Sequence, residues 1–175
     1  MANHIERRPN RRIRRAYLQA VRQARTSIDI TNPYFLPGPL FLRALRQAHD
    51  RGVLVRLLVP RHSDVWLVAL AMRELLESLA RHGISVFAYE RSILHAKTAV
   101  FDERLVIVGS HNLDALSWRF NLEANLAIED ARFAATATRS FERDLRDARR
   151  LGGVEQQRSR WSSLDWLVAK LRGYL

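Results

Sequence analysis

The fold is decided by residues 27–59, which read SIDITNPYFLPGPLFLRALRQAHDRGVLVRLLV. Its first part, Ser27 to Asn32, is rich in β-branched residues and stops before a proline, which predicts a strand. The Pro37-Gly38-Pro39 segment then breaks the chain ahead of a helix over about Leu40 to Asp50. The apolar run Val53 to Val59 is typical of a strand covered on both faces. The stretch therefore predicts a βαβ unit.

The same periodicities continue outward from this unit in both directions. We expect further helices at about 13–24, 64–82, 113–119 and 131–151, and further strands at about 84–89, 94–101, 105–108 and 122–128. The tight turn Asp102-Glu103-Arg104 joins two of these strands into a hairpin. This alternation predicts an α/β fold with a mixed β-sheet that is flanked by helices on both faces.

Residues 1–151 are predicted to form one domain. A polar linker over 152–160 follows, and then an amphipathic helix over 161–175 with apolar side chains at helical spacing. Its stripe consists of Trp161, Leu164, Leu167, Val168, Leu171 and Leu175. Basic residues flank the stripe, so this helix is expected either to lie on an anionic membrane surface, or to pack on the domain or cover the interface of a missing second half.

Composition excludes several classes of protein. The 175 residues include no cysteine, which rules out a disulfide framework and a thiolate metal site. No apolar run approaches the ~20 residues of a membrane-spanning helix. The net charge is +11, and only Lys97 and Lys170 are lysines among the 29 basic residues. Such a charge attracts phosphate-rich partners, either nucleic acid or anionic lipid headgroups, without choosing between them.

The densest motif lies in the second half of the chain. The stretch from His95 to Asp102 reads HAKTAVFD and fits H-x-K-x4-D, and Gly109-Ser110-His111-Asn112 follows after the hairpin. Side chains alternate along a strand, so His95 and Lys97 are expected to project together and to address one phosphate. Asp102 lies an odd number of positions from His95, and we expect it to brace the hairpin.

These residue types suit chemistry on a phosphodiester. A shielded phosphorus needs a neutral nucleophile together with fixed donors for the developing charge, and a histidine beside a lysine meets that need. Glu123 shares a strand face with Asn125 and is the candidate carboxylate that orients the ring of His95. His111 is expected at an exposed hairpin end, and the remaining histidines are expected to be structural or on the surface.

The pattern of H-x-K-x4-D, then G-S-x-N, then an acidic residue eleven positions later resembles the phospholipase D superfamily. Within it, residues 32–38 and 109–125 look most like the C-terminal half of bacterial cardiolipin synthases. The resemblance implies a phospholipase D-like α/β/α sandwich that forms one half of the usual two-domain assembly.

The resemblance also implies roles for individual residues. His95 would attack phosphorus and form a phosphohistidine, while Lys97 and Asn112 would hold the phosphoryl oxygens. Ser110 would support that hydrogen-bond network, and Glu123 would orient His95. Asp102 would be structural. No cofactor and no metal ion is implied.

Family members combine two such halves, whereas this chain has one copy of the motif. A second half is therefore expected from a homodimer mate or from a missing N-terminal half. The function implied first is phosphatidyl transfer between two phosphatidylglycerol molecules at the cytoplasmic, inner face of the cell membrane, with an anionic phospholipid as substrate. The alternatives are a homodimeric nuclease or phosphodiesterase acting on nucleic acid, and an inactive half-domain.

Overall fold

The computed structural model describes residues 10–62, 66–114, 117–118 and 121–152. Its helices are α1 (Arg11–Gln23), α2 (Pro39–Asp50), α3 (Trp66–Arg81) and α5 (Ala131–Leu145). Its strands are β1 (Ser27–Thr31), β2 (Leu54–Pro60), β3 (Ser85–Tyr89), β4 (Thr98–Phe101), β5 (Leu105–Gly109), β6 (Asn125–Glu129) and β7 (Ala148–Leu151). The predicted βαβ unit is confirmed as β1, α2 and β2.

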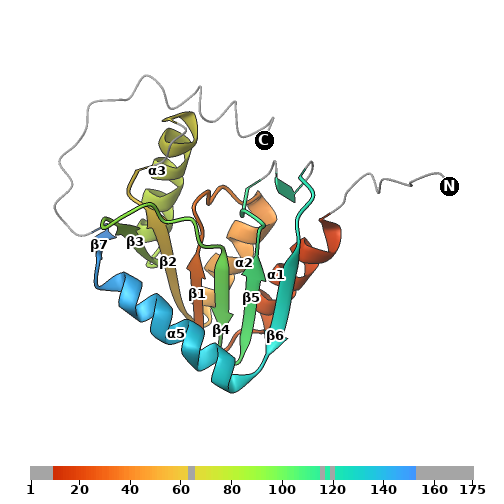
Figure 1. The fold of residues 1–175 in the computed structure, drawn as a ribbon. Coiled ribbons are helices and arrows are strands. Elements are labelled where there is room, and N and C mark those ends of the chain that lie inside the picture. The colour runs from red at the N-terminus through yellow and green to blue at the C-terminus, as the bar shows by residue number, and fades with distance from the viewer. Residues whose placement is uncertain (1–9, 63–65, 115–116, 119–120, 153–175) are drawn as a thin grey trace.

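The strands form one seven-stranded sheet in the order β6-β5-β4-β1-β2-β3-β7 (Figure 1). The central strands β1, β2 and β3 run parallel to one another. The other neighbours pair antiparallel, including the β4–β5 hairpin. The mixed sheet that the sequence predicts is therefore confirmed.

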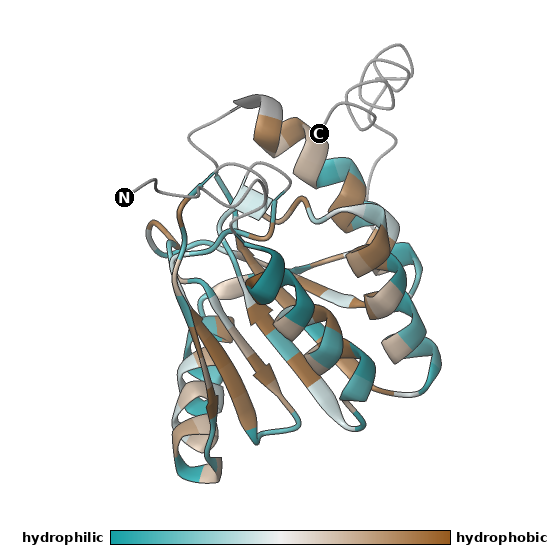
Figure 2. Ribbon diagram, turned by 90° about the vertical axis from the view of Figure 1, so that its right-hand side faces the viewer, coloured by the Kyte–Doolittle hydropathy of each residue, from teal (hydrophilic) through white to brown (hydrophobic). Residues whose placement is uncertain are grey.

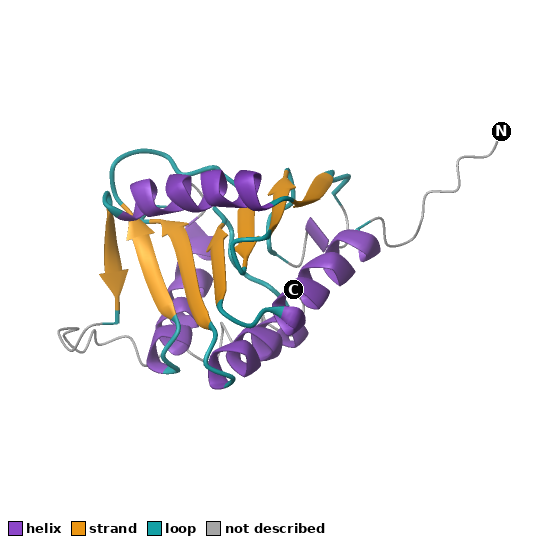
Figure 3. Ribbon diagram, turned by 90° about the horizontal axis from the view of Figure 1, so that it is seen from below, coloured by secondary structure: helices purple, strands orange, loops and turns teal. Residues whose placement is uncertain are grey.

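Helices cover both faces of this sheet. Helix α5 lies across one face, while α1, α2 and α3 lie on the other (Figure 3). Strand β2 shows why the apolar run in its sequence is nearly continuous. Its residues Val55, Leu57 and Val59 pack into the core on the α1–α3 side, and Leu58 packs with Phe141 of α5. The strands accordingly carry much of the hydrophobic colour in Figure 2.

The strand predicted over 94–101 is shorter than expected, because β4 begins at Thr98. Strand β1 ends at Thr31, the partner of Thr98, and Pro33 prevents its extension. His95 and Lys97 therefore lie in the extended segment before the strand.

The predicted end of the helix over 131–151 is also wrong. Helix α5 stops at Leu145, and the chain continues as β7, which pairs with β3. Without β7, strand β3 would be an unpaired edge of the sheet. Pairing with β7 gives hydrogen-bond partners to backbone groups of β3 that would have none if the helix continued. The predicted linker and terminal helix lie outside the described residues, apart from Gly152, and of the helix predicted at 113–119 only Ser117 and Trp118 are described as helical.

Within the described residues, no helix combines the length and the apolar character that crossing a membrane requires.

Candidate active site

The motif residues gather at one edge of the sheet because of strand direction. Strand β5 runs antiparallel to both β4 and β6, with Thr98 opposite Val108 and Gly109 opposite Asn125. The start of β4, the end of β5 and the start of β6 therefore coincide. This edge receives His95 and Lys97 ahead of β4, Ser110 and Asn112 after β5, and Glu123 ahead of β6.

His95 and Lys97 are in direct contact. The Lys97 Nζ lies 3.3 Å from each ring nitrogen of His95 and donates to the His95 carbonyl oxygen at 2.9 Å. Lys97 is buried while His95 is exposed, so the ring remains open to a substrate. Burial lowers the pKa of Lys97, and the charge of Glu123 acts in the opposite direction. The pair thus places a cation beside the candidate nucleophile.

Glu123 bonds to neighbours other than His95. Ser110 Oγ donates to Glu123 Oε2, and Asn121 Nδ2 donates to Glu123 Oε1 at 3.3 Å. Among the described residues, no hydrogen bond joins Glu123 to His95. The orienting role of Glu123 therefore stays a prediction, whereas the link between Ser110 and Glu123 is present.

Gly109 allows this close approach. A Cβ at residue 109 would overlap the carbonyl oxygen of Ala124 and would lie 2.7 Å from the Cα of Asn125. Any larger residue would push β5 away from the segment that leads into β6. Glycine is thus required where Ser110 must reach Glu123.

His111 is buried, with none of its surface exposed, so its predicted exposure is wrong. Two asparagines turn its backbone inward. Asn125 Oδ1 accepts from His111 N at 3.3 Å, and Asn32 Nδ2 donates to His111 O at 3.4 Å. The ring then packs against Trp118 with centroids 4.1 Å apart and a tilt of 49° between the ring planes. Among the described residues, neither ring nitrogen of His111 makes a hydrogen bond of good geometry. Burial lowers the pKa of this side chain, while the charges of Glu123 and Asp114 and the nearby backbone of Asn112 and of His111 itself act in the opposite direction.

Asn112 follows on the same loop and is half-buried, and its Oδ1 has no hydrogen-bond partner among the described residues. Asn32 holds the loop from the end of β1, since its Oδ1 accepts from Leu113 N at 3.2 Å. Sequence reasoning did not assign Asn32 or Asn125 to the site. The available signal was position, because Asn32 directly follows β1 at the same edge of the sheet and Asn125 begins β6.

Asp102 lies at the opposite end of the sheet from His95. Its carboxylate accepts from the backbone N–H groups of Arg25, Thr26 and Ser27 and from Thr26 Oγ1, at 2.8 to 3.0 Å. Burial alone would raise the pKa of Asp102, but these donors outweigh it and the pKa is lowered. Asp102 and Glu103 both have positive φ, and the bonds hold this turn against the α1–β1 connection.

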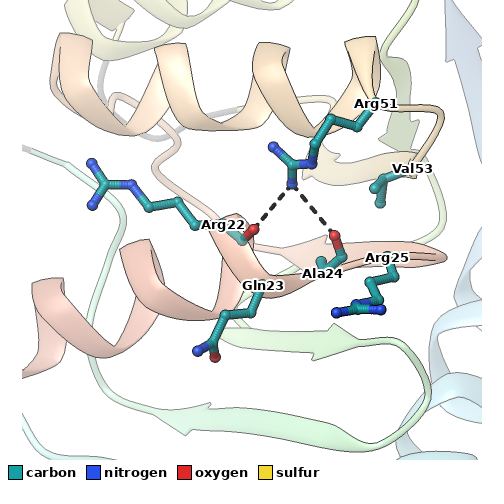
Figure 4. A pocket seen from close by; sticks show the side chains of 6 residues that line it. All are labelled: Arg22, Gln23, Ala24, Arg25, Arg51 and Val53. Carbon is teal, nitrogen blue, oxygen red and sulfur yellow. Dashed lines mark hydrogen bonds between the residues drawn. The ribbon is translucent and has the colours of Figure 1, made fainter.

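A shallow hollow at that opposite end is a poor candidate for the site. Its lining consists of Arg22, Gln23, Ala24, Arg25, Arg51 and Val53 (Figure 4). The Arg51 guanidinium donates to the carbonyl oxygens of Arg22 at 3.2 Å and Ala24 at 3.4 Å. This cation caps the end of α1 and is not free for a ligand. In the described part of the chain, no three His, Cys, Asp or Glu side chains gather as a metal site would require.

Comparison with protein families matches residues 17–145 to the family described as cardiolipin synthase, PLD-like domain. Cardiolipin synthase B of Escherichia coli O6:H1 is 43% identical over 135 residues, which cover 77% of this chain and 31% of that protein. The major cardiolipin synthase ClsA of Bacillus subtilis is 33% identical over 160 residues, 91% of this chain and 33% of that protein. The chain thus spans about a third of the length of these relatives.

Solved structures share the fold. The phospholipase D family member Nuc from Salmonella typhimurium matches with a TM-score of 0.71 and 23% identity, covering 80% of this chain and 91% of that one. The phosphatidylserine synthase of Haemophilus influenzae also matches with a TM-score of 0.71, at 14% identity, over 93% of this chain and 42% of that one.

Proposed function

Because the chain belongs to the family described as cardiolipin synthase, PLD-like domain, we propose that it supplies half of an active site for phosphatidyl transfer. The nucleophile is His95, and the substrate is an anionic phospholipid at the inner face of the cell membrane. The overall reaction converts two phosphatidylglycerol molecules into cardiolipin and glycerol. The observation that carries the proposal is the contact of the Lys97 ammonium with both ring nitrogens of exposed His95.

In the first step, a ring nitrogen of His95 attacks phosphorus. A P–N bond forms, the P–O bond to the terminal glycerol breaks, and the glycerol oxygen takes a proton from an acid on the second half of the site. In the second step, a hydroxyl of another phosphatidylglycerol attacks the phosphohistidine. The P–N bond breaks, a P–O bond forms, and the proton of that hydroxyl returns to the acid.

The residues around His95 stabilise the charge that develops. Lys97 and Asn112 hold the phosphoryl oxygens, and the burial of Lys97 strengthens its electrostatic effect at the site edge. Ser110 fixes Glu123 through the bond described above. Glu123 in turn faces Lys97 with a compensating charge, and its role in orienting a histidine ring is part of this proposal.

A second half has an exposed apolar surface on which to pack. Leu122, ahead of β6, is 87% exposed, and Leu126, within β6, is 66% exposed. Strand β6 forms an edge of the sheet, so its outer backbone groups have no strand neighbour among the described residues. Apolar side chains on an open edge are typical of a surface that a partner covers. A homodimer mate or an N-terminal half could supply the partner.

The competing function is a homodimeric nuclease or phosphodiesterase with the same nucleophile, and the net charge of +11 favours it. An inactive half-domain is the remaining alternative. Two assays separate these functions: glycerol release from phosphatidylglycerol vesicles, and salt-sensitive nicking of duplex DNA.

The nucleophile is tested by trapping the intermediate. A short-chain phosphatidylglycerol should label His95 with an acid-labile adduct detectable by mass spectrometry, and His95→Asn should carry none. Glycerol release with a labelled His95 and cardiolipin as the second product supports the transferase, whereas phosphatidic acid as the second product indicates hydrolysis. DNA nicking without glycerol release favours the nuclease, and no adduct from either substrate contradicts covalent catalysis at this position.

A further inference from the structure

The first turns of α1 form an unusually basic surface. The helix has the sequence RRIRRAYLQAVRQ, with five arginines and no acidic residue. Arg11, Arg12, Arg14 and Arg15 are all exposed. In the described part of the chain, none of these four side chains forms a hydrogen bond or an ion pair. We call these four residues the α1 cationic face, and in Figure 2 the start of α1 is coloured as strongly hydrophilic.

This arrangement is unfavourable for the helix itself. The amino end of a helix carries partial positive charge and favours acidic residues, yet the first turn of α1 has none. Arg11 also faces Arg14 and Arg15 at spacings of three and four, where like charges repel. Elsewhere, exposed arginines such as Arg61 and Arg104 pair with Glu90 and Glu129. The α1 cationic face is therefore not explained by the stability of the fold.

Hydrogen bonds fasten this end of α1 to the active-site edge. The buried Asn10, which precedes the helix, donates to Ser117 O at 2.5 Å and to Asn121 O at 2.7 Å. Asn121 bonds to Glu123, and Glu123 bonds to Ser110. Three hydrogen bonds in series therefore connect Ser110 to Asn10, the residue just before the α1 cationic face. The start of α1 and the active-site edge both lie at the upper end of the molecule in Figure 1.

We propose that the α1 cationic face docks the active-site edge onto an anionic lipid surface. This inference rests on the proposed function, because a phosphatidyl group must be drawn from a bilayer. Arginine suits the task because its guanidinium can donate two hydrogen bonds to one phosphate. The charge complementarity is strong, since four exposed cations with no ion-pair partner among the described residues lie within five residues, and an anionic leaflet attracts each of them.

The docking is tested by replacing the face without unfolding the helix. Arg11→Gln, Arg12→Gln, Arg14→Gln and Arg15→Gln are combined in the full chain. The loss of repulsion predicts a melting temperature equal to or above that of the unmodified chain. Binding to vesicles of phosphatidylglycerol and phosphatidylcholine, measured by co-sedimentation, should weaken at least about tenfold.

A matched variant removes the same charge elsewhere. Arg22, Arg25, Arg132 and Arg139 are exposed and form no ion pair among the described residues, and they lie at the far end of the sheet or on α5. Their combined replacement by Gln should weaken vesicle binding no more than about threefold. An Arg→Lys version of the α1 variant should retain most of the binding, because the attraction is electrostatic.

Three results would overturn the proposal: unchanged vesicle binding by the α1 variant, equal losses in both quadruple variants, or a loss confined to duplex DNA binding. Adduct formation on His95 from a soluble short-chain substrate needs no bilayer. The failure of that adduct would count against the proposed function, whereas vesicle binding tests the docking face alone.

Discussion

Asp102 is the residue whose replacement should report most directly on the hairpin. Its carboxylate gathers three backbone donors and one hydroxyl from the α1–β1 connection. Asp102→Asn keeps one acceptor oxygen but loses the charge, so we expect a loss of about 1–3 kcal/mol in the free energy of unfolding. Urea titration at neutral pH measures this loss.

The same replacement should change the response to acid. The pKa of Asp102 is lowered in the folded chain, so its contribution is present above the unfolded value of 3.8 and is lost as the pH falls through the folded value. The difference between the original chain and Asp102→Asn should therefore shrink in strong acid. Normal stability combined with lost turnover would contradict a bracing role and would place Asp102 in the chemistry.

His111 should make the protein sensitive to mild acid. The ring of His111 is buried and makes no hydrogen bond of good geometry with the described residues. Burial lowers its pKa in the folded state, although the charges of Glu123 and Asp114 and the backbone of Asn112 and of His111 itself act against this shift. The unfolded chain therefore binds the proton more readily, and stability should fall as the pH drops below 6.5. His111→Phe keeps a ring against Trp118 and removes two unpaired nitrogens, so it should be neutral or stabilising.

Thermal melts between pH 8 and pH 5 measure this effect. The original chain should lose melting temperature across the range more steeply than His111→Phe. Parallel profiles, or a variant that is strongly destabilised at pH 8, would show that a ring nitrogen of His111 has a stabilising partner.

These residues show which features of the site local sequence patterns can predict and which they cannot. Strand order in the sequence predicts that His95, Lys97, Ser110, Asn112 and Glu123 come from segments adjacent to β4, β5 and β6, and the fold brings those segments to one edge. The burial of His111 could not be predicted, because it depends on Asn32, 79 positions away. Alternation describes side-chain direction within a strand and does not describe a loop folded inward.

At the scale of elements, a buried ion pair between β1 and β2 extends to α5 through a half-exposed glutamate. Asp29 on β1 is 2% exposed and accepts from Arg56 Nε on β2 at 2.6 Å, and Arg56 Nη1 also meets Glu142 of α5 at 2.5 Å. Arg56→Met should lower the free energy of unfolding by about 3–5 kcal/mol, because it leaves the buried carboxylate of Asp29 without its cation. Denaturant unfolding gives the value directly.

Glu142→Gln provides the matched control, since Glu142 is 47% exposed. Loss of this exposed charge should lower the free energy of unfolding by no more than about 1 kcal/mol. If Arg56→Met and Glu142→Gln cost the same, the burial of Asp29 does not set the energetics of the network, and α5 is held chiefly by Phe141 and its apolar neighbours.

Element boundaries were predictable where sequence chemistry marks them. Pro33 ends the segment that contains β1, and Asp130 begins α5 by accepting from Phe133 N at 2.7 Å. The end of α5 carries no comparable local signal. Strand β7 forms there because β3 has an open edge about sixty residues earlier in the chain, and helical periodicity carries no information about such long-range pairing.

At the scale of the whole molecule, we predict that activity requires a particle with two H-x-K motifs, because this chain has one and its apolar Leu122 and Leu126 are open to a partner. An active particle built from this chain alone should therefore weigh about twice 20.3 kDa by light scattering.

Mixing the chain with an equal amount of His95→Asn separates a shared site from independent sites. Random exchange leaves about a quarter of the particles with two intact histidines, so the rate should be about a quarter of that of the original chain at the same total protein concentration. A fall to about one half would show that each chain acts alone and would contradict a shared site. A monomer that stays inactive at every concentration would contradict pairing between copies, and the second motif would then have to come from an N-terminal half.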